Sequence, residues 1–283
     1  MADTARRHGQ RRRKRPVAYA LRIFVIAYLG LLVAWPVGLI AKTTFADGFA
    51  SLRDTLGDAN VRHALFLTLR VAIIAVIVNL VFGVGVSLLL VRYRFPGRRL
   101  LSALIDLSLS VSPVVVGLAL LLVYSPRTGW FGPTLADHGV HIIFATPGIV
   151  IATIFVSLPL VVREVAPVLE EIGMDQELAA RSLGANGIQT FRRITLPSIR
   201  WAVAYGVVLS LARAIGEYGA VKVVSGNLVG RTQTATLVVE QEYGEFHQPI
   251  AYATSFLLAF ASIACIVVVA IIRPRDNQRK VST

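Results

Sequence analysis

Three ionisable side chains, Arg213, Glu217 and Lys222, interrupt an otherwise apolar stretch of the sequence, residues 211–227. If this stretch spans a membrane, each ionised side chain near its centre costs about 2.5 to 3.5 kcal/mol, so exposure to lipid without a partner is unfavourable. Arg213 and Glu217 are four residues apart, which places them on one face of a helix where they can form an ion pair. The chemistry that these residues offer is the attraction or repulsion of a charged solute.

Two interpretations of this stretch stay open. Either the face that carries Arg213 and Glu217 borders a translocation path or its gate, or the two residues form a buried pair that only fixes helix packing. Gly216 and Gly219 allow a neighbouring backbone to approach the same region closely. Lys222, one turn from the outer end, is suited to attracting an anion at an entrance or to extending toward lipid headgroups.

A second polar region, residues 163–200, has the features of a docking element. Gly173 is expected to end one helix and Asp175 to cap a short second one. Gly184 is expected to stop this short helix in the left-handed conformation. The pattern predicts a helix that ends in a glycine elbow.

A further helix is expected to begin at Asn186, a favourable N-cap residue, and to be limited by Pro197, which lacks a backbone donor. This arrangement leaves apolar side chains that nothing in the chain obviously covers, namely Leu178, Ala179, Leu183, Phe191 and Ile194. Small residues at Ala179 and Ala180 permit the close approach of a partner groove. The alternative is an amphipathic unit that rests on lipid headgroups, which nearby arginines also favour.

The amino-acid composition indicates the class of protein to which these residues belong. Of 283 residues, 55% are hydrophobic and 16% are charged, whereas soluble domains carry about 25% charged residues. The mean hydropathy of +0.67 excludes a disordered chain, and a single cysteine excludes a disulfide scaffold. The net charge of +13 comes from short basic blocks between apolar runs, so we expect a membrane protein and no nucleic-acid partner.

Six apolar runs reach or approach the ~20 residues that a membrane-spanning helix needs. They are residues 17–41, 63–91, 100–124, 146–162, 201–224 and 250–272. The runs lack the alternation of barrel strands, so the predicted fold is all-α, a polytopic bundle of six transmembrane helices. The first run, at 25 residues, is longer than the apolar core of a signal peptide and is interpreted as a retained helix.

The basic residues predict the orientation of the bundle. Twenty lysines and arginines lie in the two tails and in the links after the second and fourth runs, whereas five lie in the opposite loops. We therefore expect a basic cytoplasmic tail over residues 1–16, a membrane domain over 17–272 with a cytoplasmic loop over 163–200, and a cytoplasmic tail over 273–283. Both termini are predicted to be cytoplasmic in a multi-pass protein of the cell membrane.

No motif for catalysis, nucleotide binding or a metal site is present in the sequence. A phosphate-binding loop of the form G-x-x-x-x-G-K-[ST] is missing, so we expect a chain that is not an enzyme and binds no cofactor or metal. If ATP drives this protein, a partner chain must bind the ATP and its magnesium ion.

The polar loop is identified by its resemblance to a known motif. Glu177-x-Ala179 followed by Gly184, with Ile194-x-Leu196-Pro197, resembles the EAA loop of ABC importer permeases, the element that such subunits seat in a cleft of their ATPase. Leu178 stands where the motif usually has its first alanine, a mild exchange between helix-forming residues. The resemblance implies these ATPase-docking residues: Glu177, Leu178, Ala179, Ala180, Gly184, Phe191, Ile194, Leu196 and Pro197.

A second resemblance narrows the family. Residues 212–221 and 224–227 resemble the permeases of sulfate and molybdate importers, and residues 110–118, 124–131 and 144–150 are similar to the W-type permeases of sulfate/thiosulfate ABC importers. The likeness extends over about residues 61–272. It implies a type I importer that pairs this chain with a homologous T-type permease, two ATPase subunits and an extracytoplasmic sulfate-binding protein. The implied path or gate residues are Arg213, Gly216, Glu217, Gly219 and Lys222.

Two alternatives remain beside the sulfate importer. Molybdate is also a tetrahedral dianion, and the sequence does not distinguish it from sulfate. A secondary anion transporter would need coupling-ion carboxylates and usually inverted repeats. The predicted spans contain Asp106 and Glu217 as their only acids, and a docking loop has no role in that scheme.

Overall fold

The computed structural model describes residues 15–46 and 48–272 of the chain, and within these residues it contains helices and no strand. The predicted all-α fold is confirmed. The predicted cytoplasmic tails, residues 1–16 and 273–283, lie outside the described residues except for Arg15 and Pro16.

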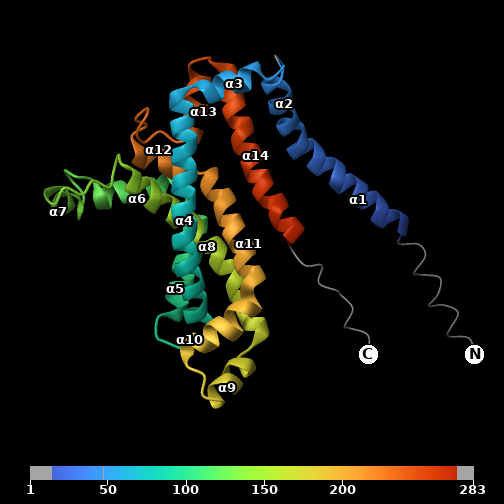
Figure 1. Cartoon of the computed structure of the whole chain (residues 1–283), viewed down its shortest axis with the longest axis vertical. Coiled ribbons are helices and arrows are strands. Elements are labelled where there is room, and N and C mark those ends of the chain that lie inside the picture. The colour runs from blue at the N-terminus through green and yellow to red at the C-terminus, as the bar shows by residue number, and fades with distance from the viewer. Residues whose placement is uncertain (1–14, 47, 273–283) are drawn as a thin grey trace, which may run out of the picture.

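Four long helices run along the long axis of the molecule and form its bundle (Figure 1). They are α4 (Ala59–Arg92), α8 (Thr146–Ile172), α11 (Leu196–Ile215) and α14 (Gln248–Ile272). The 34 residues of α4 correspond to about 51 Å, more than the ~30 Å of a hydrocarbon core. α4 therefore extends beyond the membrane.

The apolar core lies where these helices meet. Toward one end, Leu67 and Val71 of α4 share a buried cluster with Ile149 of α8. Toward the other end, Val84 of α4 is buried with a set of α8 and α11 side chains, namely Val161, Val165, Leu169 and Ile199. Since α4, α8 and α11 pack against one another, they form the centre of the bundle.

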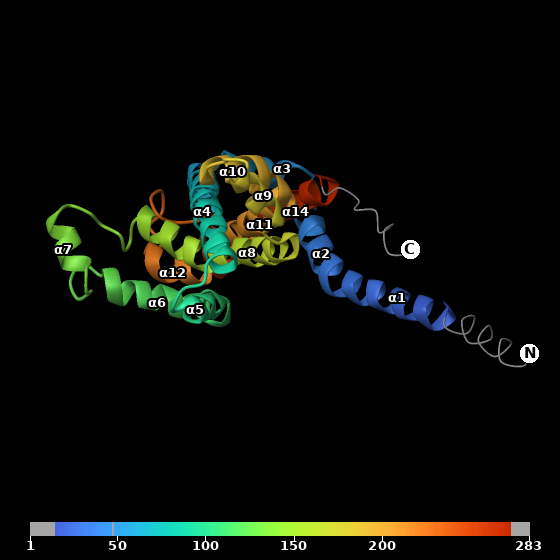
Figure 2. The same cartoon turned by 90° about the horizontal axis from the view of Figure 1, so that it is seen from below.

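The N-terminal helices lie at the periphery. α1 (Arg15–Leu29), the π-helical turn η1 (Gly30–Ala34) and α2 (Trp35–Thr44) follow one another, and α2 lies against α14 while α1 projects away from the bundle (Figures 1 and 2). The span Tyr19–Thr44 buries none of its most apolar window within this chain. Lipid or another subunit must cover this surface. The short helix α3 (Ala50–Gly57) then leads into α4.

The third predicted span is not one straight helix. It is divided into α5 (Arg98–Ser110) and α6 (Pro113–Tyr124), which are bent by 114° relative to each other. Pro113 stands at the start of α6, where its missing N–H costs nothing, and it disfavours helical geometry in the residue before it. The described residues therefore contain five unbroken candidate spans, or six if this bent pair counts as one.

The fifth predicted span is also broken. Helix α11 ends within this span, at Ile215. A separate helix, α12 (Gly219–Ser225), follows it and packs against α6. The fourth run, predicted over residues 146–162, continues as helix α8 to Ile172.

The two ends of the bundle carry different short helices. α9 (Asp175–Ser182), α10 (Gly187–Thr190) and the π-helical turn η2 (Phe191–Thr195) lie at one end, whereas α3 and α13 (Ala235–Gly244) lie at the other (Figure 1). Helix α7 (Gly132–Asp137) projects from the side with α6 (Figure 2).

Candidate functional site

The polar loop between α8 and α11 forms a protruding unit of two short helices joined by a glycine elbow. Gly173 ends α8 with φ of 70°, and Gly184 follows α9 with φ of 86°. Both φ values are positive, which glycine adopts without strain. The predicted helix end at Gly173 and the predicted positive-φ turn at Gly184 are therefore confirmed. Asn186 caps α10 in a capping box, in which its side chain accepts the N–H of Gln189 at 2.9 Å and Gln189 Oε1 accepts the N–H of Asn186 at 3.0 Å.

The predicted cap at Asp175 is wrong. Asp175 is the first residue of α9, the N-cap position is Met174, and no side chain accepts a hydrogen bond there. The two acidic residues in the first turn, Asp175 and Glu177, instead favour the helix N-terminus through the helix dipole.

Pro197 does not limit the second helix either. The chain from Gly187 to Ile215 runs as one 29-residue span, because the π-helical turn η2 shifts the hydrogen-bond pattern just before the proline. The N–H of Leu196 donates to the carbonyl of Phe191, five residues earlier. This wider turn allows the helix to continue although Pro197 has no backbone N–H to donate.

Several predicted docking side chains lie on the outer surface of this unit. The predicted docking residue Leu178 is 50% exposed, and Leu183, which the sequence left uncovered, is 90% exposed. Ile188, which was not predicted, is 72% exposed. Ala179, Gly184, Leu196 and Pro197 are exposed, whereas Ala180, Phe191 and Ile194 are half-buried. Leu183 directly follows α9 and precedes the Gly184 elbow, and α9 lies at one end of the bundle (Figure 1). This tip presents apolar surface that no other part of the described chain covers.

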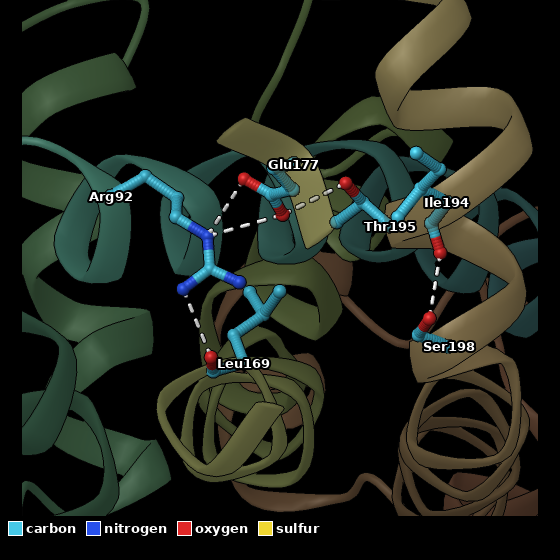
Figure 3. A network of polar contacts seen from close by, with 6 residues as sticks. All are labelled: Arg92, Leu169, Glu177, Ile194, Thr195 and Ser198. Atoms are coloured by element: carbon cyan, nitrogen blue, oxygen red, sulfur yellow. Dashed lines mark hydrogen bonds and ion pairs between the residues drawn. The ribbon is translucent and has the colours of Figure 1, made fainter. Parts of the chain in front are cut away.

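Glu177 faces the opposite way, into the protein. Its side chain is 8% exposed and forms an ion pair with Arg92 at the end of α4, with 3.1 Å between Oε2 and Nε. Its Oε1 also accepts a hydrogen bond from the Thr195 hydroxyl at 2.9 Å. Figure 3 shows the carboxylate between these two partners. The glutamate of the motif is therefore enclosed by its own chain.

The break in the fifth span is organised by Glu217. Its side chain is 2% exposed, and Oε2 lies 2.8 Å from Arg213 Nη1, which confirms the predicted ion pair. Its Oε1 accepts the backbone N–H of Ala220 in the first turn of α12 at 3.0 Å, and its backbone carbonyl accepts the Thr236 hydroxyl at 2.9 Å. One residue thus satisfies polar groups on both sides of the break, as a chain interruption within a membrane requires.

The other predicted path residues have different surroundings. A Cβ at Gly219 would lie 3.1 Å from Pro113 Cβ, so this glycine permits the close contact of α12 with α6. Gly216 is exposed, and among the described residues a Cβ there would approach no atom closer than 3.8 Å. Lys222 is paired with Glu240 of α13 and donates to the Tyr218 hydroxyl at 2.8 Å. Its charge is compensated within the chain.

Comparison with known proteins identifies the family. Residues 79–279 match the model of the binding-protein-dependent transport system inner membrane component. The chain belongs to this family. It is therefore a multi-pass membrane protein and a transport component, not a catalytic one. This membership favours the importer over the secondary transporter among the predicted alternatives, because the family is described as a component of binding-protein-dependent transport systems.

Individual relatives place the permease more narrowly. It is 45% identical to the sulfate transport system permease protein CysW of Synechococcus elongatus, over 96% of this chain and 94% of the relative. It is 35% identical to the sulfate transport system permease protein CysT of Salmonella typhimurium, over 90% of this chain and 92% of the relative. A bacterial ABC transporter that imports the acidic polysaccharide alginate has the same fold, with a TM-score of 0.76 at 17% identity over 96% of this chain and all of that chain.

One polar cluster of this permease was not predicted from the sequence. Asn79 of α4 is fully buried, and its Nδ2 donates to Ser157 of α8 at 2.7 Å and to Ser210 of α11 at 3.2 Å. These bonds join the three central helices, in the manner of polar side chains that hold membrane helices together. The available signal was an asparagine in the middle of the apolar run 63–91.

Proposed function

We propose that this chain is a permease subunit of an ATP-driven sulfate importer. The observation that carries the proposal is the 45% identity to a sulfate transport permease over 96% of the chain, which includes the docking loop and the broken fifth span. The chain would form half of a translocation path, and a homologous T-type permease, of the kind represented by the CysT relative, would form the other half.

The importer needs partners that supply energy and substrate. ATP and magnesium would bind to two separate ATPase subunits, since this sequence contains no phosphate-binding loop. An extracytoplasmic binding protein would deliver sulfate to the outward-facing path. ATP would close the ATPase pair, and the docking loops would transmit this closure to the helices of the path, the alternating-access mechanism of type I importers.

The docking contact is proposed for the exposed tip of the polar loop. Leu183, Ile188 and Leu178 would enter an apolar cleft of the ATPase, and the small residue Ala179 would allow close approach. Leu183→Asp would place a charge in that cleft. Loss of ATPase copurification with this variant is expected, whereas normal copurification would contradict the docking role.

The orientation follows from the same proposal. Arg92 is the last residue of α4 and Arg98 the first of α5, and the link between these helices lies at the end of the bundle that carries α9 and α10 (Figure 1). The docking loop itself adds Arg181 in α9 and Arg192 in η2. A basic end is typical of the cytoplasmic side. In Figure 1 the N-terminal end of α1 and the C-terminal end of α14 both point toward this end of the bundle, so the two termini would be cytoplasmic.

Arg213 is the side chain best placed to meet an anion in the path. Its side chain is 37% exposed in the isolated chain, it lies directly before the helix break, and its partner Glu217 holds it in place. Lys222 is a weaker candidate for the entrance, because Glu240 compensates its charge.

Transport assays test the proposed substrate. The full set of subunits, reconstituted in proteoliposomes, should accumulate radiolabelled sulfate only with ATP inside and binding protein outside. Thiosulfate and molybdate uptake are measured in parallel. Molybdate uptake without sulfate uptake would contradict the assignment and support the alternative dianion.

A further inference from the structure

We propose that Arg92 is a positioning residue for the coupling of ATP hydrolysis to transport. Its contacts with Glu177 and α8 join the docking helix α9 to the central bundle, so that the two move as one body. This inference rests on the proposed function of the loop, and it assigns a role to a residue outside the docking motif.

The contacts of Arg92 connect three helices at one point. Arg92 is the last residue of α4, and its side chain is 7% exposed. Nε lies 3.1 and 3.2 Å from the two carboxylate oxygens of Glu177, and Nη1 donates to the carbonyl of Leu169 at 2.9 Å. That carbonyl is one of the last four in α8, which have no partner within their own helix. Arg92 therefore connects the ends of α4 and α8 to α9 (Figure 3).

Glu177 extends the connection to a fourth element. Its Oε1 accepts the hydroxyl of Thr195 in η2, so α9 is also tied to the turn that leads into α11. With both partners in place, the carboxylate is enclosed by its own chain, and its side chain is 8% exposed. The surface that faces outward is the Leu183 tip, at the other end of α9.

The connection matters because the backbone on both sides of α9 turns sharply. Gly173 and Gly184 flank the helix, both with positive φ, and the structure gives α9 no buried apolar residue of its own. The orientation of α9 relative to the bundle therefore depends on its one buried side chain, Glu177. A displacement of the Leu183 tip by the ATPase reaches α4, α8 and η2 through this carboxylate.

A buried ion pair of this kind has a distinct mutational signature. Removal of one partner leaves an uncompensated buried charge, whereas removal of both leaves a neutral site that can still assemble. Lysine at position 92 keeps the charge but lacks the planar fork that contacts Glu177 and the Leu169 carbonyl at once. Arg92→Lys is therefore the mild variant, and Arg92→Met with Glu177→Gln is the neutral one.

The experiment measures sulfate transported per ATP hydrolysed, together with copurification of the ATPase, in the reconstituted importer. The neutral double variant should copurify with the ATPase, and its transport per ATP should fall at least tenfold. Arg92→Lys and Thr195→Val should each reduce the ratio about threefold. A residue that only stabilises the fold would lower the yield of complex without changing this ratio.

Two controls match these variants. Thr190→Val removes a buried hydroxyl from the same loop that bonds only within its own helix, to Asn186 at 3.0 Å. Arg163→Met with Asp106→Asn removes an ion pair between α8 and α5 that is more than half exposed. Both controls should keep the ratio of the unmodified importer.

Each result bears on a specific statement. An unchanged ratio in the double variant overturns the role of Arg92, as does a double variant that loses the ATPase, because Glu177 would then be a docking contact. If the permease chain of the double variant does not fold, so that no permease can be purified, unchanged ratios in both Arg92→Lys and Thr195→Val overturn the inference. Leu183→Asp separates the two proposals, since retention of the ATPase by that variant contradicts the docking function itself.

Discussion

Arg213 and Glu217 pair across the last turn of α11, and the same glutamate carboxylate accepts a backbone N–H of α12 on the far side of the helix break. The two partners are unequally buried, with 2% of the Glu217 side chain exposed and 37% of the Arg213 side chain. The pair and the break are therefore one structural unit. The contribution of this unit to the stability of the complex can be measured separately from its role in transport.

A double-mutant cycle tests this unit. Arg213→Met leaves a deeply buried carboxylate without its cation, a loss of about 3 to 5 kcal/mol. Glu217→Gln should cost less, because Arg213 is partly exposed and the amide oxygen can still accept the Ala220 N–H. The double variant should recover complex assembly relative to Arg213→Met, as measured by thermal unfolding of the purified complex.

Transport by the double variant then separates the two interpretations of the pair. We expect an assembled complex that hydrolyses ATP but takes up little sulfate, because we propose that Arg213 contacts the anion in the path. Near-normal sulfate uptake would show that the pair serves packing alone.

Gly184 should be required for its backbone conformation. A Cβ there meets no atom within 4 Å, so the expected effect of Gly184→Val comes from the positive φ of 86° and amounts to about 1 to 2 kcal/mol. The variant should insert in the membrane normally and bind the ATPase more weakly. Gly187→Ala is the control, since its Cβ is also unobstructed and its φ is not positive. Equal copurification of the ATPase with both variants would refute this role.

The contact between α4 and α8 predicts opposite effects at two glycines of the same helix. A Cβ at Gly83 would lie 2.7 Å from Val161 Cγ1, so Gly83→Ala should destabilise the complex by about 1 to 3 kcal/mol through overpacking. At Gly85 the Cβ meets no atom of the described chain within 4 Å, and Gly85→Ala should stabilise the helix by about 0.5 to 1 kcal/mol. Thermal unfolding of the two variants side by side checks the prediction, and the same sign for both would contradict it.

Substitution of the buried Asn79 should destabilise the complex, and a charged replacement should do so more than an apolar one. Asn79→Leu loses two interhelical hydrogen bonds, an expected cost of about 1 to 2 kcal/mol. Asn79→Asp should be worse, since a charge at the centre of a span costs about 2.5 to 3.5 kcal/mol. Ser87→Ala is the control, because Ser87 bonds only to the Gly83 carbonyl of its own helix. The ranking is read from the yield and thermal stability of the complex.

The chain alone should not hydrolyse ATP, because no phosphate-binding loop is present in its sequence. Activity is expected only after the ATPase subunits are added. Hydrolysis by the purified single chain, above the level of an identically purified empty-vector control, would contradict this division of roles.

The features that sequence reasoning predicted correctly depend on residues close together in the chain. The Arg213–Glu217 pair follows from the four-residue spacing of a helix, and the turns at Gly184 and Asn186 follow from local backbone and capping preferences. The all-α membrane fold follows from the long apolar runs, because a membrane leaves backbone groups no partner outside their own helix.

Tertiary structure decided the features that depend on distant residues or on competing local signals. Glu177 was predicted to dock the ATPase, yet it is buried and paired with Arg92, which is 85 positions earlier in the sequence and lies beside it in the folded chain. Pro113 stands at a helix break, whereas Pro197 is absorbed into a continuous helix by a π-helical turn. Both prolines stand in the first turn of a helix, so local propensity does not distinguish them. Their helices have different neighbours, since α6 packs against α12 and α11 packs against α8. Asn79 likewise acquires its role only when α8 and α11 bring Ser157 and Ser210 to it, because hydrogen bonds between helices depend on their arrangement in space and not on spacing along one of them.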